Sequence, residues 1–284
     1  MKKERVVNTL KATIYINVHI LVLCLGFLLS KVLYNRQPNM VPAQFLTLRG
    51  VISTIYSILV VHVNLKKEVW DNLPEGCFVA LMKRSLQGCC LILVQFTIVK
   101  HLSLVYIGLA QNIAPLVTIV LSYFMIGEQL KRSDFLMIGI TFVGVTLITF
   151  GFDEKAEVDG DAPLLAKLGA FCIPLLLSYG NILMRQMAGL GENTVSLYLN
   201  FFLTLAMLAY TNIQGLSLDF LKELGPLDWA LAVVVSVMSV VAQTLKFIAL
   251  QNEQPAKLSH YQYLGTVYQL LFDVLLLDRV FSQL

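Results

Sequence analysis

The chain has 284 residues, of which 57% are hydrophobic and only 14% are charged, with 21 Lys and Arg against 18 Asp and Glu. A soluble domain carries about 25% charged residues because its surface must be hydrated, whereas the mean hydropathy here is +0.73. This composition excludes a soluble cytosolic enzyme and a disordered chain. The net charge of +3 is small and scattered, so nucleic acid is not an expected partner.

Nine apolar segments follow one another along the chain, separated by short islands of charged residues. Each is about 20 residues long, which is enough for a helix to cross a bilayer. The segments lie at residues 12–34, 43–65, 78–99, 102–126, 134–151, 163–185, 193–213, 227–250 and 255–277. We therefore predict an all-α polytopic membrane protein with nine spans, integral to a lipid bilayer.

Basic residues in the loops set the orientation of such a protein, because the cytosolic side carries more Lys and Arg. With a cytosolic N-terminus, that side receives most of the basic residues, while the acidic linker at residues 151–163 falls on the other side. We therefore predict a cytosolic N-terminus. Lys83 and Arg84 then mark the cytosolic start of the third span, with residues 75–82 at the membrane interface.

The chain also shows a weak internal repeat, in which residues 106–134 resemble residues 256–284 at a constant offset. In this alignment Gln111 pairs with Tyr261, Pro115 with Gly265 and Glu128 with Asp278. Because a five-helix unit is odd, a second copy must enter the membrane from the opposite side. The sequence therefore predicts an inverted repeat, the arrangement in which many secondary transporters place a substrate site between two halves near the bilayer midplane.

A known family shares the features of residues 84–151. These features are a short turn at 100–103, the tripeptide Ala110-Gln111-Asn112, Pro115, Gly127-Glu128 and glycines at 139, 144 and 151. The pattern resembles the EamA-like repeat of the drug/metabolite transporter superfamily, which includes the solute carrier 35-like proteins. The similarity is good over the first half of the chain and diffuse over the second.

The resemblance implies ten helices in two inverted five-helix repeats. Residues 1–151 would form the first EamA-like repeat, with helices one to five, and residues 163–284 would form the second, with helices six to nine. The sequence ends at Leu284, where a tenth helix would begin. The second repeat is therefore expected to be incomplete.

Two amides lie near the middle of the fourth span, where a polar side chain costs free energy unless it faces a partner or water. These are Gln111 and Asn112. Pro115 cannot donate a backbone hydrogen bond to the carbonyl of Gln111, so a kink there leaves that carbonyl free. The carbonyl and the Asn112 amide then either line a substrate cavity or form hydrogen bonds between helices.

A polar stripe runs along the ninth span. Gln262, Thr266, Gln269 and Asp273 follow one another at steps of four, three and four residues, which places them on one face of a helix. Lipid cannot satisfy such a face, so it either lines a cavity or packs on other helices. Tyr261 beside the stripe either stacks on a planar ligand or anchors the helix at the interface.

Two basic residues lie inside predicted spans. Lys246 lies near the cytosolic end of the eighth span, one turn from Gln243, and Arg49 lies a few residues into the second. Each either neutralises an anionic substrate or extends its long side chain to the lipid headgroups. We favour the second interpretation for both, because for Lys246 only about four residues of helix, or roughly 6 Å, separate it from the membrane surface. Two cations do not by themselves define an anion site.

No motif in the sequence indicates an enzyme. The four histidines stand singly, without the spacing of a metal site, and no P-loop, GxGxxG or GxSxG motif occurs. Glu128 follows the fourth span close to Lys131 and Arg132, which is typical of a carboxylate in a solvated turn. We therefore predict no catalytic residue, no metal ion and no cofactor.

Together these patterns predict one substrate site, near the midplane and between the two halves. The residues expected there are Asn112, Gln111, Gln262, Gln269, Gln243, Gln95 and Lys246, with Tyr261 or Tyr179 as an apolar wall. The predicted function is secondary transport of a small polar metabolite by alternating access, with the substrate unknown and a homodimer as one assembly to consider. The alternative is a non-transporting structural membrane subunit that retains the transporter fold.

Overall fold

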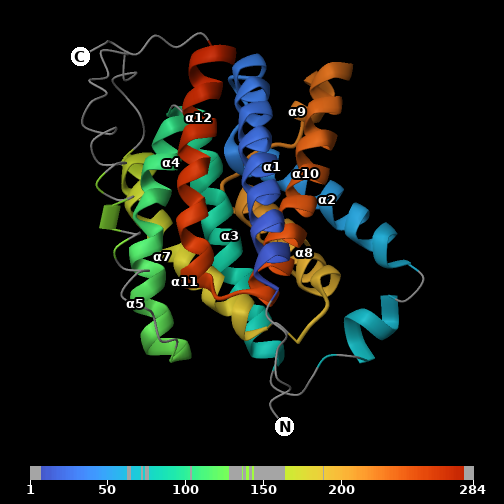
Figure 1. Cartoon of the computed structure of the whole chain (residues 1–284). Coiled ribbons are helices and arrows are strands. Elements are labelled where there is room, and N and C mark those ends of the chain that lie inside the picture. Colours follow the sequence, from blue (N-terminus) through green and yellow to red (C-terminus); the bar gives the residue numbers. More distant parts are fainter. Residues whose placement is uncertain are drawn as a thin grey trace.

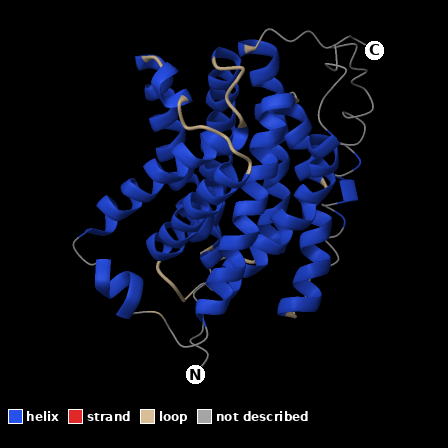
Figure 2. Ribbon diagram, turned by 180° about the vertical axis from the view of Figure 1, so that it is seen from behind, coloured by secondary structure: helices blue, strands red, loops and turns tan. Residues whose placement is uncertain are grey.

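The computed structural model describes residues 8–62, 65–71, 73, 77–102, 104–127, 136, 139, 140, 143, 164–187 and 189–277. Within these ranges the chain forms helices joined by turns and loops, and it contains no strand (Figure 2). Most of the predicted fifth span at 134–151, together with Glu128, the linker at 151–163 and the end of the chain from 278, lies outside the described residues.

The helices form a bundle in which long elements from both halves of the chain lie side by side (Figure 1). In chain order they are α1 (Thr9–Arg36), α2 (Pro42–Val61), α3 (Cys77–His101), α4 (Leu104–Asn112), α5 (Ala114–Ile126), α7 (Leu164–Gln186), α8 (Glu192–Ile213), α9 (Phe220–Glu223), α10 (Pro226–Asn252), α11 (Pro255–Leu258) and α12 (Tyr263–Leu276). A single π-helical turn, Lys67–Asp71, lies between α2 and α3.

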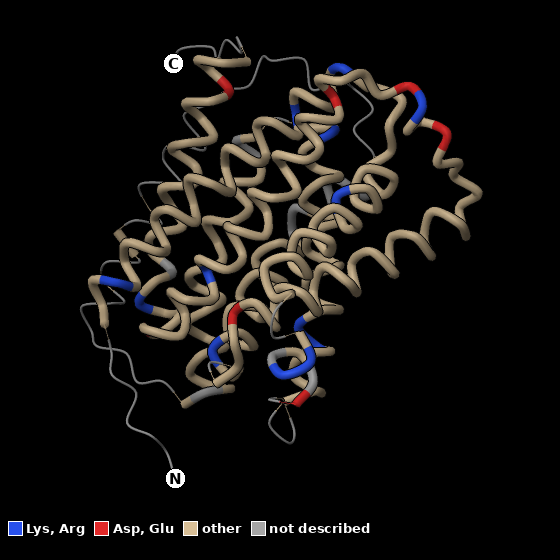
Figure 3. Tube along the Cα trace, turned by 90° about the vertical axis from the view of Figure 1, so that its right-hand side faces the viewer, with Lys and Arg blue, Asp and Glu red and all other residues tan. Residues whose placement is uncertain are grey.

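Six helical stretches among the described residues are long and apolar enough to cross a membrane. They are Thr9–Arg36, Pro42–Val61, Cys77–His101, Ile107–Met125, Glu192–Ile213 and Pro226–Asn252. Their outer faces carry exposed aliphatic and aromatic side chains, while Lys, Arg, Asp and Glu gather toward the two ends of the bundle (Figure 3). A bilayer would solvate this distribution, because its core is apolar and its surfaces are wet. The bundle therefore has the surface of an integral membrane protein.

Local sequence signals set several helix ends. The side chain of Asn8 accepts a hydrogen bond from the Lys11 N–H at 3.0 Å and so caps the start of α1. Pro42 and Pro226 occupy the first positions of α2 and α10, where a missing N–H costs nothing. Gly127 ends α5 with a φ of 69°, a left-handed conformation that glycine adopts without strain.

Two predicted spans are interrupted rather than continuous. The fourth is divided into α4 and α5 at Ile113, because Pro115 at the start of α5 lacks the N–H that a continuous helix needs. The ninth consists of α11, a 3-10 turn (Ser259–Gln262) and α12. Gln262 is therefore the N-cap residue of α12. It precedes the helix whose polar face was expected to include it.

Polar contacts at both ends of α1 fix its antiparallel pairing with α10. The Thr9 hydroxyl donates to the Glu253 carboxylate at 2.7 Å at one end, and Arg36 donates to Asp228 at 2.5 Å at the other. These contacts join the first helix of the first half of the chain to a helix of the second half.

Two further antiparallel pairs also cross between the halves. The Gln44 amide at the start of α2 donates to the carbonyl of Ser217, just beyond α8, at 2.6 Å. In the pair of α3 with α7, the Gln87 amide donates to the Leu176 carbonyl at 2.6 Å. Further along this pair, Val94 of α3 packs against Gly169 of α7. The bundle is therefore built from pairs of helices that bring the two halves together.

Candidate functional site

A cavity of about 70 Å³ lies in the middle of the bundle, between α1, α2 and α3 of the first half and α7, α8 and α10 of the second. One water needs roughly 10–15 Å³ by this measure, so the cavity has room for a few waters or one small solute. Its polar lining residues are His19, Arg49, Arg84, Gln95, Ser239, Gln243 and Lys246. We call this space the central cavity.

Three cationic side chains line the central cavity, and this corrects the interpretation favoured from sequence. Lys246 and Arg49 were expected to reach the headgroups, and Arg84 to mark the cytosolic start of the third span. Instead all three line the cavity, where Arg49 is 3% exposed and Arg84 is 5% exposed. Because α3 begins at Cys77, Arg84 lies about two turns inside this helix rather than at the start of the span.

Neutral groups hold Arg49 in place. Its Nε donates to the hydroxyl of Ser239 at 3.0 Å, while that hydroxyl donates to the Val235 carbonyl of its own helix at 2.7 Å. The guanidinium also lies 4.9 Å from the centre of the Phe96 ring, a favourable cation–π distance. Nη1 is buried without a hydrogen-bond partner among the described residues, so this donor remains available.

Arg84, in the same cavity, has a similar environment. Its Nη1 donates to the Gln87 side-chain carbonyl at 2.7 Å, and the Gln87 amide is itself fixed by the Leu176 carbonyl. Nε of Arg84 is buried without a partner among the described residues. Both guanidinium groups are therefore oriented by neutral acceptors, which leave their positive charge uncompensated.

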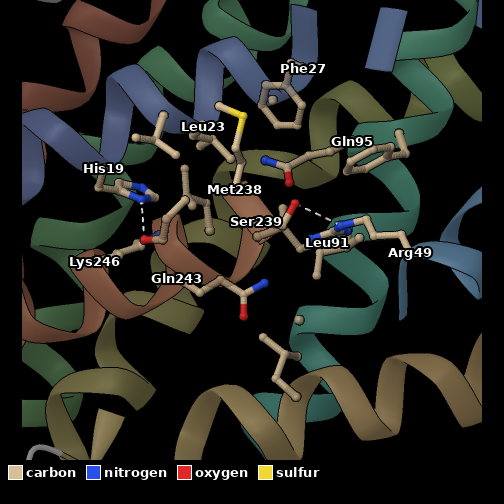
Figure 4. A pocket seen from close by; sticks show the side chains of 18 of the residues that line it. His19, Leu23, Phe27, Arg49, Leu91, Gln95, Met238, Ser239, Gln243 and Lys246 are labelled. Carbon is tan, nitrogen blue, oxygen red and sulfur yellow. Dashed lines mark hydrogen bonds between the residues drawn. The ribbon is translucent and has the colours of Figure 1, made fainter. Parts of the chain in front are cut away.

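Lys246 and His19 form the other end of the cavity. Figure 4 shows them on one side and Arg49 with Ser239 on the other, with Gln95 and Gln243 between. The Nδ1 atom of His19 lies 2.7 Å from the carbonyl of Ala242, so this nitrogen carries the proton and donates. Lys246 and Arg84 line the same cavity, which adds like charge to like.

Carboxylates are absent from the described lining of the central cavity. The acidic residues nearest the ends of α10 are engaged elsewhere, Asp228 with Arg36 and Glu253 with Thr9 and Lys257. Burial raises the pKa of Glu253, but hydrogen bonds from the next backbone N–H, from Thr9 and from Lys257 hold that pKa below its usual value. The cavity thus carries basic groups without an acidic counterpart.

The predicted amides divide into two groups. Gln95 and Gln243 line the central cavity together with Lys246. Gln111, Asn112 and Gln269 lie instead where α4 packs on α12, so the structure does not bring all the expected residues together in one pocket. Their role as substrate ligands remains a prediction.

The contact between α4 and α12, here called the α4–α12 interface, is tightly packed. The Thr266 hydroxyl donates to Oδ1 of Asn112 at 2.9 Å, and the Leu104 N–H donates to Asp273 at 3.4 Å. A Cβ atom added at Gly108 would lie 2.5 Å from Oε1 of Gln269. In this structure the polar stripe therefore faces a helix–helix contact rather than open space.

The remaining predicted residues lie apart from the cavity. Tyr261 is half-buried beside the start of α1, with its hydroxyl 3.3 Å from that of Thr13, and its ring stacks on His260 with centroids 4.1 Å apart. Gln262 is half-buried at the N-cap of α12. Tyr179 is half-buried on α7 and is absent from the lining of the central cavity.

Sequence reasoning missed several cavity residues, notably Arg84, His19 and Ser239. A charged residue inside an apolar span was the available signal, and it was present for Arg84 at the edge of the third span. His19 and Ser239 gave no such signal, since single polar residues occur throughout the spans. In the part of the chain that the structure describes, no cluster of His, Cys, Asp or Glu is arranged to hold a metal ion.

The chain is similar to known proteins in its sequence. Residues 10–150 match the EamA-like transporter family. A relative from Saccharomyces cerevisiae, named Probable transport protein YPL264C, is 26% identical over 273 residues, which cover 87% of this chain and 76% of the relative. The chain is therefore similar to EamA-like transporters over residues 10–150, and to a transport protein over most of its length.

One solved structure has a similar fold. It is the crystal structure of a protein that is 16% identical in sequence and matches with a TM-score of 0.66. The match covers 94% of this chain and 88% of the other. At this identity the likeness concerns the fold alone. The family match, the transport relative and the apolar helices together indicate an integral membrane transporter.

Proposed function

We propose that the chain is a secondary transporter that carries a small polar solute through the central cavity by alternating access. The observation that supports this most strongly is the position of the cavity, between α1, α2 and α3 of one half and α7, α8 and α10 of the other. Rocking two halves about such a site would expose it to each side of the membrane in turn.

Helix pairing supports an inverted repeat as the basis of this movement. The first helix of the first half, α1, packs on α10, and the first helix of the second half, α7, packs on α3. If α10 is the third helix of its half, as α3 is of the first, the two pairings are equivalent. A pseudo-two-fold axis in the membrane plane would generate both from one contact, as in other inverted transporters.

Uptake by the full chain in liposomes tests this proposal. The reconstituted protein is assayed with a panel of labelled succinate, inorganic phosphate, glucose, alanine and choline, and protein-free liposomes give the background. We expect accumulation of at least one solute above that background, abolished when the cavity is filled. Absence of uptake for all five, with folded protein verified, would contradict transport of small solutes and favour the structural-subunit alternative.

A further inference from the structure

The central cavity contains more positive charge than its own residues balance. Arg49, Arg84 and Lys246 line it, and no Asp or Glu belongs to its described lining. A buried charge without a counter-ion is unfavourable because it has lost its hydration. Elsewhere in the described bundle the buried carboxylates Asp228 and Glu253 each form an ion pair. The described lining of the central cavity provides no such carboxylate partner for its cations.

The two guanidinium groups are also organised as donors that await an acceptor. Ser239 holds Arg49 and Gln87 holds Arg84 by one hydrogen bond each. Nη1 of Arg49 and Nε of Arg84 are buried without a hydrogen-bond partner among the described residues. Groups fixed in this way lose little conformational entropy when a ligand binds, which favours affinity. What they require is an acceptor with negative charge.

Building on the proposed transport function, we propose that the solute is a small anion carrying at least two negative charges, either a dicarboxylate or a phosphate compound. Guanidinium groups bind carboxylate and phosphate oxygens by paired, charge-assisted hydrogen bonds. Three cations match a polyvalent anion better than a monovalent one. A monovalent anion would leave the other positive charges of the cavity uncompensated. The anion is bound by Arg49, Arg84 and Lys246.

The volume of the cavity and its neutral polar side chains narrow the class of solute further. The cavity volume of about 70 Å³ is well below the roughly 300–1,000 Å³ of sites for drug-sized ligands, which favours a compact anion over a nucleotide. Gln95 and Gln243 lie between the cationic ends of the cavity (Figure 4). Their amides are placed to bind hydroxyl or carbonyl groups on the middle of such a molecule.

The test compares solutes of different charge in the same reconstituted full-length protein. Labelled succinate represents dicarboxylates, inorganic phosphate represents phosphate compounds, and glucose and choline represent neutral and cationic solutes. We expect uptake of succinate, of phosphate or of both, and background uptake of glucose and choline. Succinate uptake without phosphate uptake would assign the dicarboxylate, and the reverse would assign the phosphate compound.

Variants connect this selectivity to the three cations. R49Q, R84Q and K246Q should each weaken the anion's apparent affinity by roughly ten- to a hundredfold, because a charge-assisted hydrogen bond to a desolvated anion is lost. R84K keeps the charge and should retain part of the uptake. K222Q removes an exposed cation from the short helix α9 and should leave uptake unchanged.

The outcomes separate the two proposals. Uptake of glucose or choline with no uptake of either anion would overturn the anion inference while supporting transport. Anion uptake that survives all three cavity substitutions would also overturn it. If a variant fails to fold, succinate or phosphate is tested for its ability to raise the melting temperature of the wild-type protein in detergent, and the lack of any rise with both would contradict the inference.

Discussion

The central cavity and the α4–α12 interface both collect polar side chains inside the bundle, but they differ in charge and in packing. The cavity combines cations without carboxylates and an unfilled volume of about 70 Å³. At the interface, amides, a hydroxyl and the Asp273 carboxylate lie between helices so close that a Cβ atom at Gly108 would lie 2.9 Å from the Thr266 Cα. Polarity at mid-span is therefore common to both regions, whereas uncompensated positive charge beside open space distinguishes the central cavity.

Filling the cavity should have the largest effect on function. Gly26 of α1 lines the central cavity, and a Cβ atom added there meets nothing within 4 Å. We expect G26V to reduce uptake to background with an unchanged melting temperature, because the added side chain occupies solute space without displacing a neighbour. The smaller G26A should retain part of the uptake, and full activity of G26V would contradict a path through this cavity.

Adding a methyl group at Gly108, in the α4–α12 interface, should lower stability and leave uptake largely unchanged. A Cβ atom at Gly108 collides with the side chain of Gln269 and the backbone of Thr266, so α4 and α12 must move apart. We expect G108A to cost about 1–3 kcal/mol of stability, as overpacking of a filled core does, and to leave uptake per folded molecule largely unchanged. Thermal unfolding in detergent measures the loss, with G26A as the matched control.

Removing a cavity cation should make the ligand-free protein more stable. Lys246 lies near Arg84 and has no counter-ion in the described lining of the cavity. We expect K246M to raise stability by about 1–2 kcal/mol, since an apolar side chain avoids the desolvation of an unpaired charge, while anion uptake is lost. A drop in melting temperature would show that Lys246 supports the fold instead.

The smallest effect is expected at Asn112. Its side chain accepts a hydrogen bond from Thr266, and such bonds between membrane helices contribute about 0.6–2 kcal/mol. We expect N112L to lower the melting temperature slightly without changing the apparent affinity for the solute. A strong loss of affinity with intact folding would instead assign Asn112 to the substrate site, as the sequence first suggested.

Much of the helix layout is predictable because a bilayer imposes long apolar segments. Pro42 and Pro226 mark helix starts, and Pro115 marks the break between α4 and α5. Pairing is harder to predict. The contacts Thr9–Glu253 and Gln44–Ser217 join residues far apart in the sequence, and no local pattern encodes which helix faces which.

The candidate site shows the same limit at the level of single residues. Distance along the helix suggested that Lys246 and Arg49 could reach the headgroups, but the rotation of each helix about its axis decides the direction of the side chain. Spacing alone placed Thr266, Gln269 and Asp273 on one face, and the structure keeps them buried together on α12. The spacing could not reveal that this face of α12 meets Gly108 of α4 rather than the central cavity.

The most direct test of a wet, cationic cavity is the charge preference of a thiol placed within it. In a version of the chain with its five cysteines replaced by alanine, G26C is treated with an anionic and a cationic methanethiosulfonate reagent, and G189C on an exposed turn gives the intrinsic reactivity of each. We predict that G26C reacts faster with the anionic reagent, relative to G189C, and that succinate or phosphate slows this reaction. No reaction with either reagent, or a preference for the cationic one, would contradict the account.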